Sequence, residues 1–104
     1  MKSRFVSRLN ELLKMTDDDE YADNRRDVLQ WLIDMTVTLG DWLPENYWPH
    51  YAYFSADGGI SLEWEWGKYE IDLEITKRSK GYLSLYDNKR KDIIFMYAFN
   101  DEEA

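Results

Sequence analysis

Carboxylate side chains recur at every second position in two neighbouring segments, residues 60–66 and 69–75. The residues between them are apolar, and an alternation of period two is typical of a half-buried β-strand. The segments are separated by Gly67 and Lys68 alone. A two-residue loop with glycine first predicts a type II′ hairpin turn, which fixes how the two strands pair.

This pairing brings acidic residues directly opposite one another on the face away from the apolar residues. Glu65 opposes Glu70 and Glu63 opposes Asp72, and Glu74 extends the row. Like charges facing each other across a sheet destabilise it by roughly 0.2–1 kcal/mol per pair. The row is therefore the first candidate for a functional site.

The sequence leaves three interpretations of the row open. It could be a solvated outer face that Lys77, Arg78 or Lys80 folds back to neutralise. It could instead meet Lys and Arg side chains of a partner protein. A divalent cation is the third option, but the sequence shows no loop with the ligand spacing of a Ca²⁺ or Mg²⁺ site, so no metal or other cofactor is expected.

Aromatic residues crowd the segment after the helical half of the chain. Trp42, Trp48 and Tyr51 are candidates for anchoring a partner, together with the row of carboxylates. In the alternative, this segment folds over the open end of the core and buries them.

Catalysis has little support in the sequence. His50 is the only histidine, cysteine is absent, and no motif supplies His50 with an orienting carboxylate and a nucleophile. We therefore expect a protein that is not an enzyme and has no catalytic residues.

The composition restricts the partners. Thirteen basic against 21 acidic residues give a net charge of −8, which disfavours direct binding to nucleic acid and favours a basic partner. The basic run at residues 89–91 lies in an expected turn and is a weak candidate for a nucleic-acid patch. No apolar run suits a signal peptide or a membrane span, and with no cysteine the sequence predicts a cytoplasmic protein.

The secondary structure expected around these residues changes at about residue 40, from helices to a connector and strands. Apolar residues at helical spacing predict a helix over Lys2–Met15 and a second one that begins near residues 17–20. We expect the second helix to end at Leu39 or Gly40, with Gly40 as a left-handed cap. Residues 41–50, which contain two prolines, form a connector.

The second half of the chain is predicted to form five strands joined by turns. They are expected at residues 51–55, 60–66, 69–75, 82–86 and 93–99. The prediction is an α+β fold, with two N-terminal helices packed on one face of a five-stranded antiparallel meander. It is a single domain over residues 1–104, divided into a helical part (1–40), the connector (41–50), the sheet (51–99) and a tail (100–104).

The hairpin itself has a distinctive sequence. The stretch Asp57-Gly-Gly-Ile-Ser-Leu-Glu-Trp64, followed by Ile71-Asp-Leu-Glu-Ile75, resembles a group of small uncharacterised bacterial proteins. The match covers roughly residues 49–86. The resemblance implies a helical N-terminal half before the hairpin, and the group has no settled activity to transfer.

Together these features favour a protein that acts by covering a basic surface. We expect an antagonist such as an antitoxin, an immunity protein or a phage anti-defence (anti-CRISPR-type) inhibitor. Its partner would be a nuclease, a CRISPR-type effector or another protein that handles nucleic acid. The alternative is an assembly subunit that forms a homodimer through a strand edge or the aromatic connector.

Overall fold

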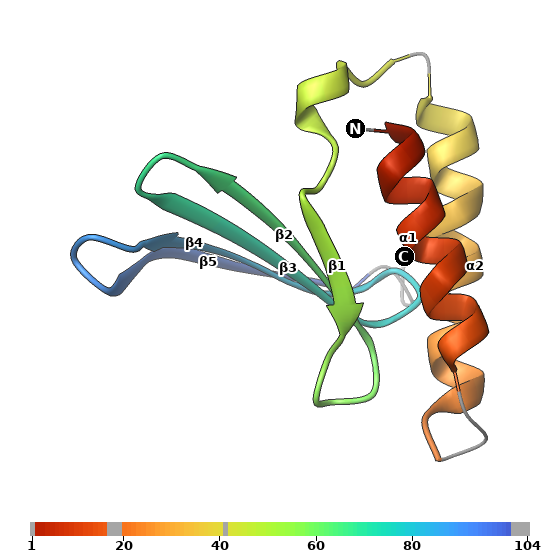
Figure 1. Ribbon diagram of the computed structural model, residues 1–104. Coiled ribbons are helices and arrows are strands. Elements are labelled where there is room, and N and C mark those ends of the chain that lie inside the picture. The colour runs from red at the N-terminus through yellow and green to blue at the C-terminus, as the bar shows by residue number, and fades with distance from the viewer. Residues whose placement is uncertain (1, 17–19, 41, 101–104) are drawn as a thin grey trace.

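The fold is that of a computed structural model, which describes residues 2–16, 20–40 and 42–100. Two helices precede a five-stranded antiparallel sheet whose strands follow chain order, β1-β2-β3-β4-β5 (Figure 1). The elements are α1 (Lys2–Met15), α2 (Ala22–Leu39), the 3₁₀ turn η1 (Glu45–Tyr47), β1 (Tyr51–Phe54), β2 (Ile60–Trp66), β3 (Tyr69–Lys77), β4 (Lys80–Asp87) and β5 (Asp92–Asn100). The predicted α+β meander is thereby confirmed.

The core lies where the helices meet one end of the sheet. Apolar residues of α1 and α2 at helical spacing pack against inward-facing residues of β1, β2 and β3. Its buried members include Leu9, Leu12, Val28, Leu29, Ala52, Ile60, Leu62 and Ile75. Removal of these side chains from water, at about 25 cal/mol per Å² of apolar surface, stabilises the fold.

The ends of α2 differ from the prediction. The helix begins at Ala22, a few residues later than expected, and residues 17–19 lie outside the described part of the chain. The predicted left-handed cap is wrong, since Gly40 has φ −54° and ψ −35°. The amides of Trp42 and Leu43 donate to the Leu39 carbonyl at 2.9 and 3.1 Å. This turn satisfies a terminal carbonyl without a left-handed residue.

The predicted register of the central hairpin is confirmed. Glu63 pairs with Asp72 and Glu65 with Glu70, and Gly67 has the positive φ of 61° that a type II′ turn requires. The strands differ at their ends: β3 extends to Lys77, β4 begins at Lys80, β5 spans residues 92–100, and β1 stops at Phe54. The expected tail beyond Asn100 lies outside the described residues.

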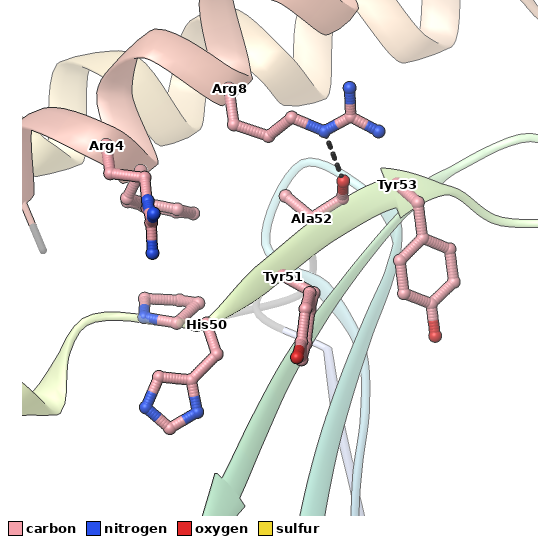
Figure 2. Close-up of a pocket in the computed structure, with 8 residues that line it drawn as sticks. Arg4, Arg8, His50, Tyr51, Ala52 and Tyr53 are labelled. Atoms are coloured by element: carbon pink, nitrogen blue, oxygen red, sulfur yellow. Dashed lines mark hydrogen bonds between the residues drawn. The ribbon is translucent and has the colours of Figure 1, made fainter.

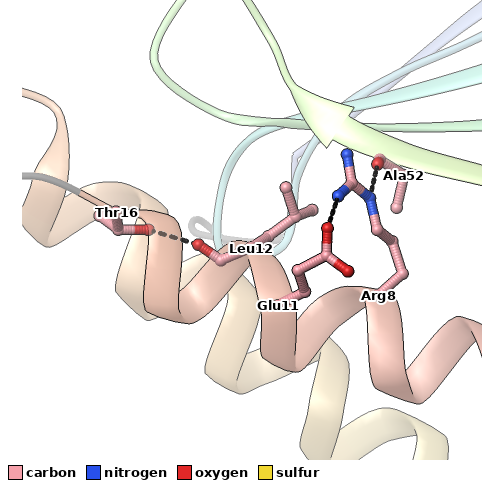
Figure 3. A network of polar contacts seen from close by, with 5 residues as sticks. All are labelled: Arg8, Glu11, Leu12, Thr16 and Ala52. Carbon is pink, nitrogen blue, oxygen red and sulfur yellow. Dashed lines mark hydrogen bonds and ion pairs between the residues drawn. The ribbon is translucent and has the colours of Figure 1, made fainter.

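Polar side chains on the helices fix the sheet to the helical layer. Asn24 donates through Nδ2 to the carbonyls of Gly58 and Thr76, at 2.9 and 2.7 Å. Arg8 of α1 donates through Nε to the Ala52 carbonyl at 2.8 Å and also pairs with Glu11 (Figure 3). These bonds hold the end of the sheet where β1 and β2 are joined, close to the helices.

The other end of the sheet is not covered. Figure 1 shows the β2–β3 and β4–β5 hairpins extending away from the two helices, which lie side by side. Burial on the inner face accordingly falls toward the hairpin tips and toward β5, where Phe95 and Tyr97 are more than half exposed. Among the described helices, none is both long and apolar enough to cross a membrane.

Candidate protein-binding face

The acidic residues singled out by the sequence lie together on the open face of the sheet. Antiparallel pairing of β2 with β3 puts them on the face opposite the helices, because side chains alternate between the two faces of a strand. We call these residues, Glu63, Glu65, Glu70, Asp72 and Glu74, the carboxylate face.

Three members of the carboxylate face form a tight cluster. Carboxylate oxygens of Glu63, Glu70 and Asp72 all lie within 4.8 Å of one another. Partial burial, hydrogen bonding to Glu70 and the neighbouring negative charge raise the pKa of Glu63 from 4.5 to about 7. The same causes in the same order raise the pKa of Asp72 from 3.8 to about 7. The cluster therefore holds protons close to neutral pH.

Glu74 lies at the end of the row nearest the helices. Burial is the main cause that raises the pKa of Glu74, Asp57 adds to it, and a hydrogen bond with Ser55 opposes it. Among the described residues, its buried Oε2 atom has no hydrogen-bond partner. Such an oxygen could accept a donor from another molecule.

Neutralisation by nearby basic residues, one of the alternatives that the sequence leaves open, does not occur in the described part of the chain. Arg78 reaches Asp27 of α2, at 3.9 Å, and Lys77 and Lys80 form no ion pair there. No described Lys or Arg pairs with any residue of the carboxylate face. Within the described part of the chain, only bound protons reduce the negative charge of the carboxylate face.

Tyrosines border the carboxylate face on both sides. Tyr51 pairs with Glu63 from β1, while Tyr82 pairs with Glu74 and Tyr86 with Glu70 from β4. Tyr82 and Tyr86 were not among the predicted site residues, because the pairing of β3 with β4 passes through a bulge near Ile75 and Lys77 that the sequence does not locate. The alternation of Tyr82, Ser84 and Tyr86 in the sequence does indicate that these three residues share one face of a strand.

This combination of groups suits cations. Carboxylates accept charge-assisted hydrogen bonds from Lys and Arg, and tyrosine rings bind the same cations through their faces. Tyr53 lies next to the cluster. Burial is the main cause that raises the pKa of Tyr53, and the negative charges of Glu63 and Asp72 raise it further.

The aromatic candidates of the connector separate into buried and exposed. Trp48 is only 3% exposed and packs against Phe5, with ring centroids 5.8 Å apart, so it belongs to the core rather than to a partner-binding surface. Trp42 is 84% exposed, and Tyr51 is half exposed. The surface candidates that remain are therefore Trp42, at the end of α2, and Tyr51, beside the carboxylate face.

His50 has a structural hydrogen bond. Its Nδ1 accepts from the amide of Glu65 at 2.8 Å, and its ring lies edge-on to Trp66 at 6.3 Å. Nδ1 is therefore engaged with the backbone of β2 and supports the strand that carries Glu65.

A cavity of about 530 Å³ lies between α1 and the free edge of β1 (Figure 2). Arg4 and Arg8 lie on its helical side, and His50, Tyr51 and Tyr53 on the other. Arg8 is already engaged with Ala52 and Glu11. The negative charge that raises the pKa of Tyr53 also opposes the binding of an anionic ligand beside Tyr53 in this cavity.

The carboxylate cluster has limited capacity for a metal. Glu63, Glu70 and Asp72 offer one oxygen each within 4.8 Å. Calcium takes about 6–8 oxygen ligands, usually from loops that also supply carbonyl groups, whereas these three residues project from strands. The geometry fits a lysine or arginine side chain better than a divalent cation.

Comparison of the chain with protein-family models, with curated proteins and with solved structures gives no match.

Proposed function

We propose that the protein is an antagonist that binds through the carboxylate face and covers a basic surface of a protein that handles nucleic acid. An antitoxin, an immunity protein and an anti-CRISPR-type inhibitor all fit this description. The observation that carries the proposal is the cluster of Glu63, Glu70 and Asp72, which has no cationic partner among the described residues.

Opposed carboxylates destabilise the isolated fold. The buried Oε2 atom of Glu74, which has no hydrogen-bond partner among the described residues, adds to this cost. A partner that brings Lys or Arg side chains to the face removes the repulsion and satisfies the oxygens. Binding of a basic partner therefore removes unfavourable interactions that remain in the isolated fold.

The nature of the partner follows from charge. Surfaces that bind phosphate backbones are rich in Lys and Arg, and their affinity depends on those charges. A sheet face with a row of carboxylates and bordering tyrosines is complementary to such a surface, and a net charge of −8 favours the encounter.

The proposal is tested by affinity capture with three forms of the protein. The wild type is compared with E63Q/E70Q/D72N, and with the control D23N/D27N/D34N on the exposed side of α2. Both variants replace three carboxyl groups by amides, and capture at pH 8 keeps Glu63 and Asp72 of the wild type largely ionised. We expect the wild type and the control to retain one basic protein and the face variant to lose it. Equal retention by all three forms would refute the carboxylate face as the binding surface.

A further inference from the structure

The outer edge of the sheet, β5, has a composition unlike the rest of the chain. Residues 93–99 read Ile-Ile-Phe-Met-Tyr-Ala-Phe and carry no charge, in a chain of which 33% is charged. Five consecutive side chains, residues 93–97, are each 48–56% exposed. An exposed apolar strand of this kind, with side chains on both faces of the sheet, marks an interaction site on a small protein.

The backbone of β5 is also available along this edge. An edge strand has a row of unpaired N–H and C=O groups, and natural proteins usually block it with charged residues, proline or a bulge. Here the bulge lies at the start of the strand, where Leu85 pairs with Phe95 and Tyr86 with Ile93. The regular segment from Phe95 to Phe99 contains no charged residue, proline or bulge.

The direction of the backbone groups follows from the register. Trp66 and Tyr69 close the two-residue turn as a hydrogen-bonded pair, and such pairs alternate along each ladder. The same alternation continues from β3 through β4 to β5. The N–H groups of Phe95 and Tyr97 therefore point to β4, and those of Met96 and Ala98 point to the free edge. Two observed bonds elsewhere in the sheet agree with it, Asn88 N to Lys68 O and Ser55 N to Gly59 O.

We propose that β5 pairs antiparallel with β5 of a second copy of this chain. The two strands would be related by a two-fold axis at Tyr97, which sets Met96 of each copy opposite Ala98 of the other. The outward N–H and C=O groups then bond across the seam. The aromatic side chains of Phe95 and Tyr97 gather on the inner face, beside the part of the sheet that the helices leave open.

A second copy fits this edge better than an unrelated strand. The matching surface should be extended, uncharged and apolar on both faces, and among the described strands β5 offers the longest uncharged segment, residues 93–99. The other edge, β1, has four residues, and Arg8 occupies one of its carbonyls. Residues 93–99 themselves carry no charge, so the paired segment adds no like-charge repulsion of its own between two chains of charge −8.

The inference goes beyond the proposed function and does not depend on it. Paired residues of antiparallel strands point to the same face, so the carboxylate faces of both copies would lie on one side of a continuous sheet. The dimer would present two acidic faces to a partner.

Sedimentation equilibrium over a wide range of protein concentration tests the dimer. We expect reversible dimerisation of the wild type, and M96K should weaken it at least about tenfold, which corresponds to 1.4 kcal/mol. V37K is the matched control, because Val37 is an exposed apolar residue of α2, away from β5. A wild type that stays monomeric, or equal weakening by both variants, would overturn the proposal.

Amide hydrogen exchange provides a second readout that also detects misfolding. In the dimer the amides of Met96 and Ala98 gain protection as the concentration rises, while those of Phe95 and Tyr97 are protected throughout by β4. In M96K the concentration dependence should disappear while Phe95 and Tyr97 remain protected. Concentration-independent exchange at Met96 and Ala98 in the wild type would contradict the pairing of β5 with β5 of a second copy.

Salt separates this proposal from the proposed function. Screening of two like-charged chains should strengthen dimerisation as NaCl is added, whereas it should weaken binding of a basic partner to the carboxylate face. Either interaction can therefore fail in these measurements without the failure of the other.

Discussion

Glu63 and Asp72 face each other across the β2–β3 ladder, and the pKa of each is raised to about 7. Both are partly buried beside Glu70, and no described Lys or Arg neutralises them. Two carboxyl groups on adjacent strands thus hold protons that isolated carboxyl groups would release. This relationship makes stability and binding depend on pH in opposite directions.

The first prediction concerns stability. In the unfolded chain these groups titrate near 4.5 and 3.8, and in the folded chain near 7. Their contribution is fully present below the unfolded values and is lost as the pH rises to about 7, because the unfolded state releases the protons first. D72N should therefore raise the free energy of unfolding by about 1 kcal/mol at pH 8 and by less at pH 4.

Urea denaturation at the two pH values measures this difference, and D34N on α2 serves as the control. A D72N variant that is destabilised at pH 8, or equally affected at both pH values, would contradict the repulsion between Glu63 and Asp72.

A second prediction concerns binding. A basic partner requires ionised carboxylates, so its affinity should fall as the pH is lowered from 8 to 6 and Glu63 and Asp72 take up protons. Titration calorimetry at the two pH values measures the change. The E63Q/E70Q/D72N variant should bind weakly at both. An affinity of the wild type that does not change over this range would argue against a role for the cluster in binding.

The third prediction separates the two tryptophans of the connector. W48A removes a buried ring of the core and should cost about 3–5 kcal/mol of stability. W42A removes an exposed ring and should change stability by less than about 0.5 kcal/mol. Thermal unfolding of the two variants checks the assignment, and similar losses from both would show that Trp42 also packs in the fold.

The fourth prediction concerns the turn before β2. A Cβ atom at Gly59 would lie 2.1 Å from the backbone oxygen of Ile75, whereas one at Gly67 would meet nothing within 4 Å. G67A should cost about 1 kcal/mol through its positive φ alone. G59A should cost clearly more, since β2 and β3 must separate. Equal denaturation midpoints of the two variants would show that the sheet adapts easily at Gly59.

The fold and the register of the hairpin could be predicted from sequence because both depend on local patterns. The alternation of residues 60–66 and the turn at Gly67 are sufficient to place Glu63 opposite Asp72. The position of the carboxylate face follows, since side chains alternate between the two faces of a sheet.

Features that depend on tertiary contacts could not be predicted in this way. Trp48 and Trp42 are both aromatic residues of one connector, and only packing against Phe5 distinguishes the buried one. The exposure of β5 follows from the packing of the helices against β1, β2 and β3. The anchoring of the sheet by Asn24 depends on carbonyls more than 30 residues away along the chain.

The most direct test of the central claim is a competition measurement with the purified partner. Fluorescence anisotropy would follow a labelled nucleic acid bound to that partner while the wild type, E63Q/E70Q/D72N or D23N/D27N/D34N is added. The wild type and the α2 control should displace the nucleic acid, and the face variant should require at least about a tenfold higher concentration. Displacement by the face variant at the same concentration as the wild type would contradict binding through the carboxylate face.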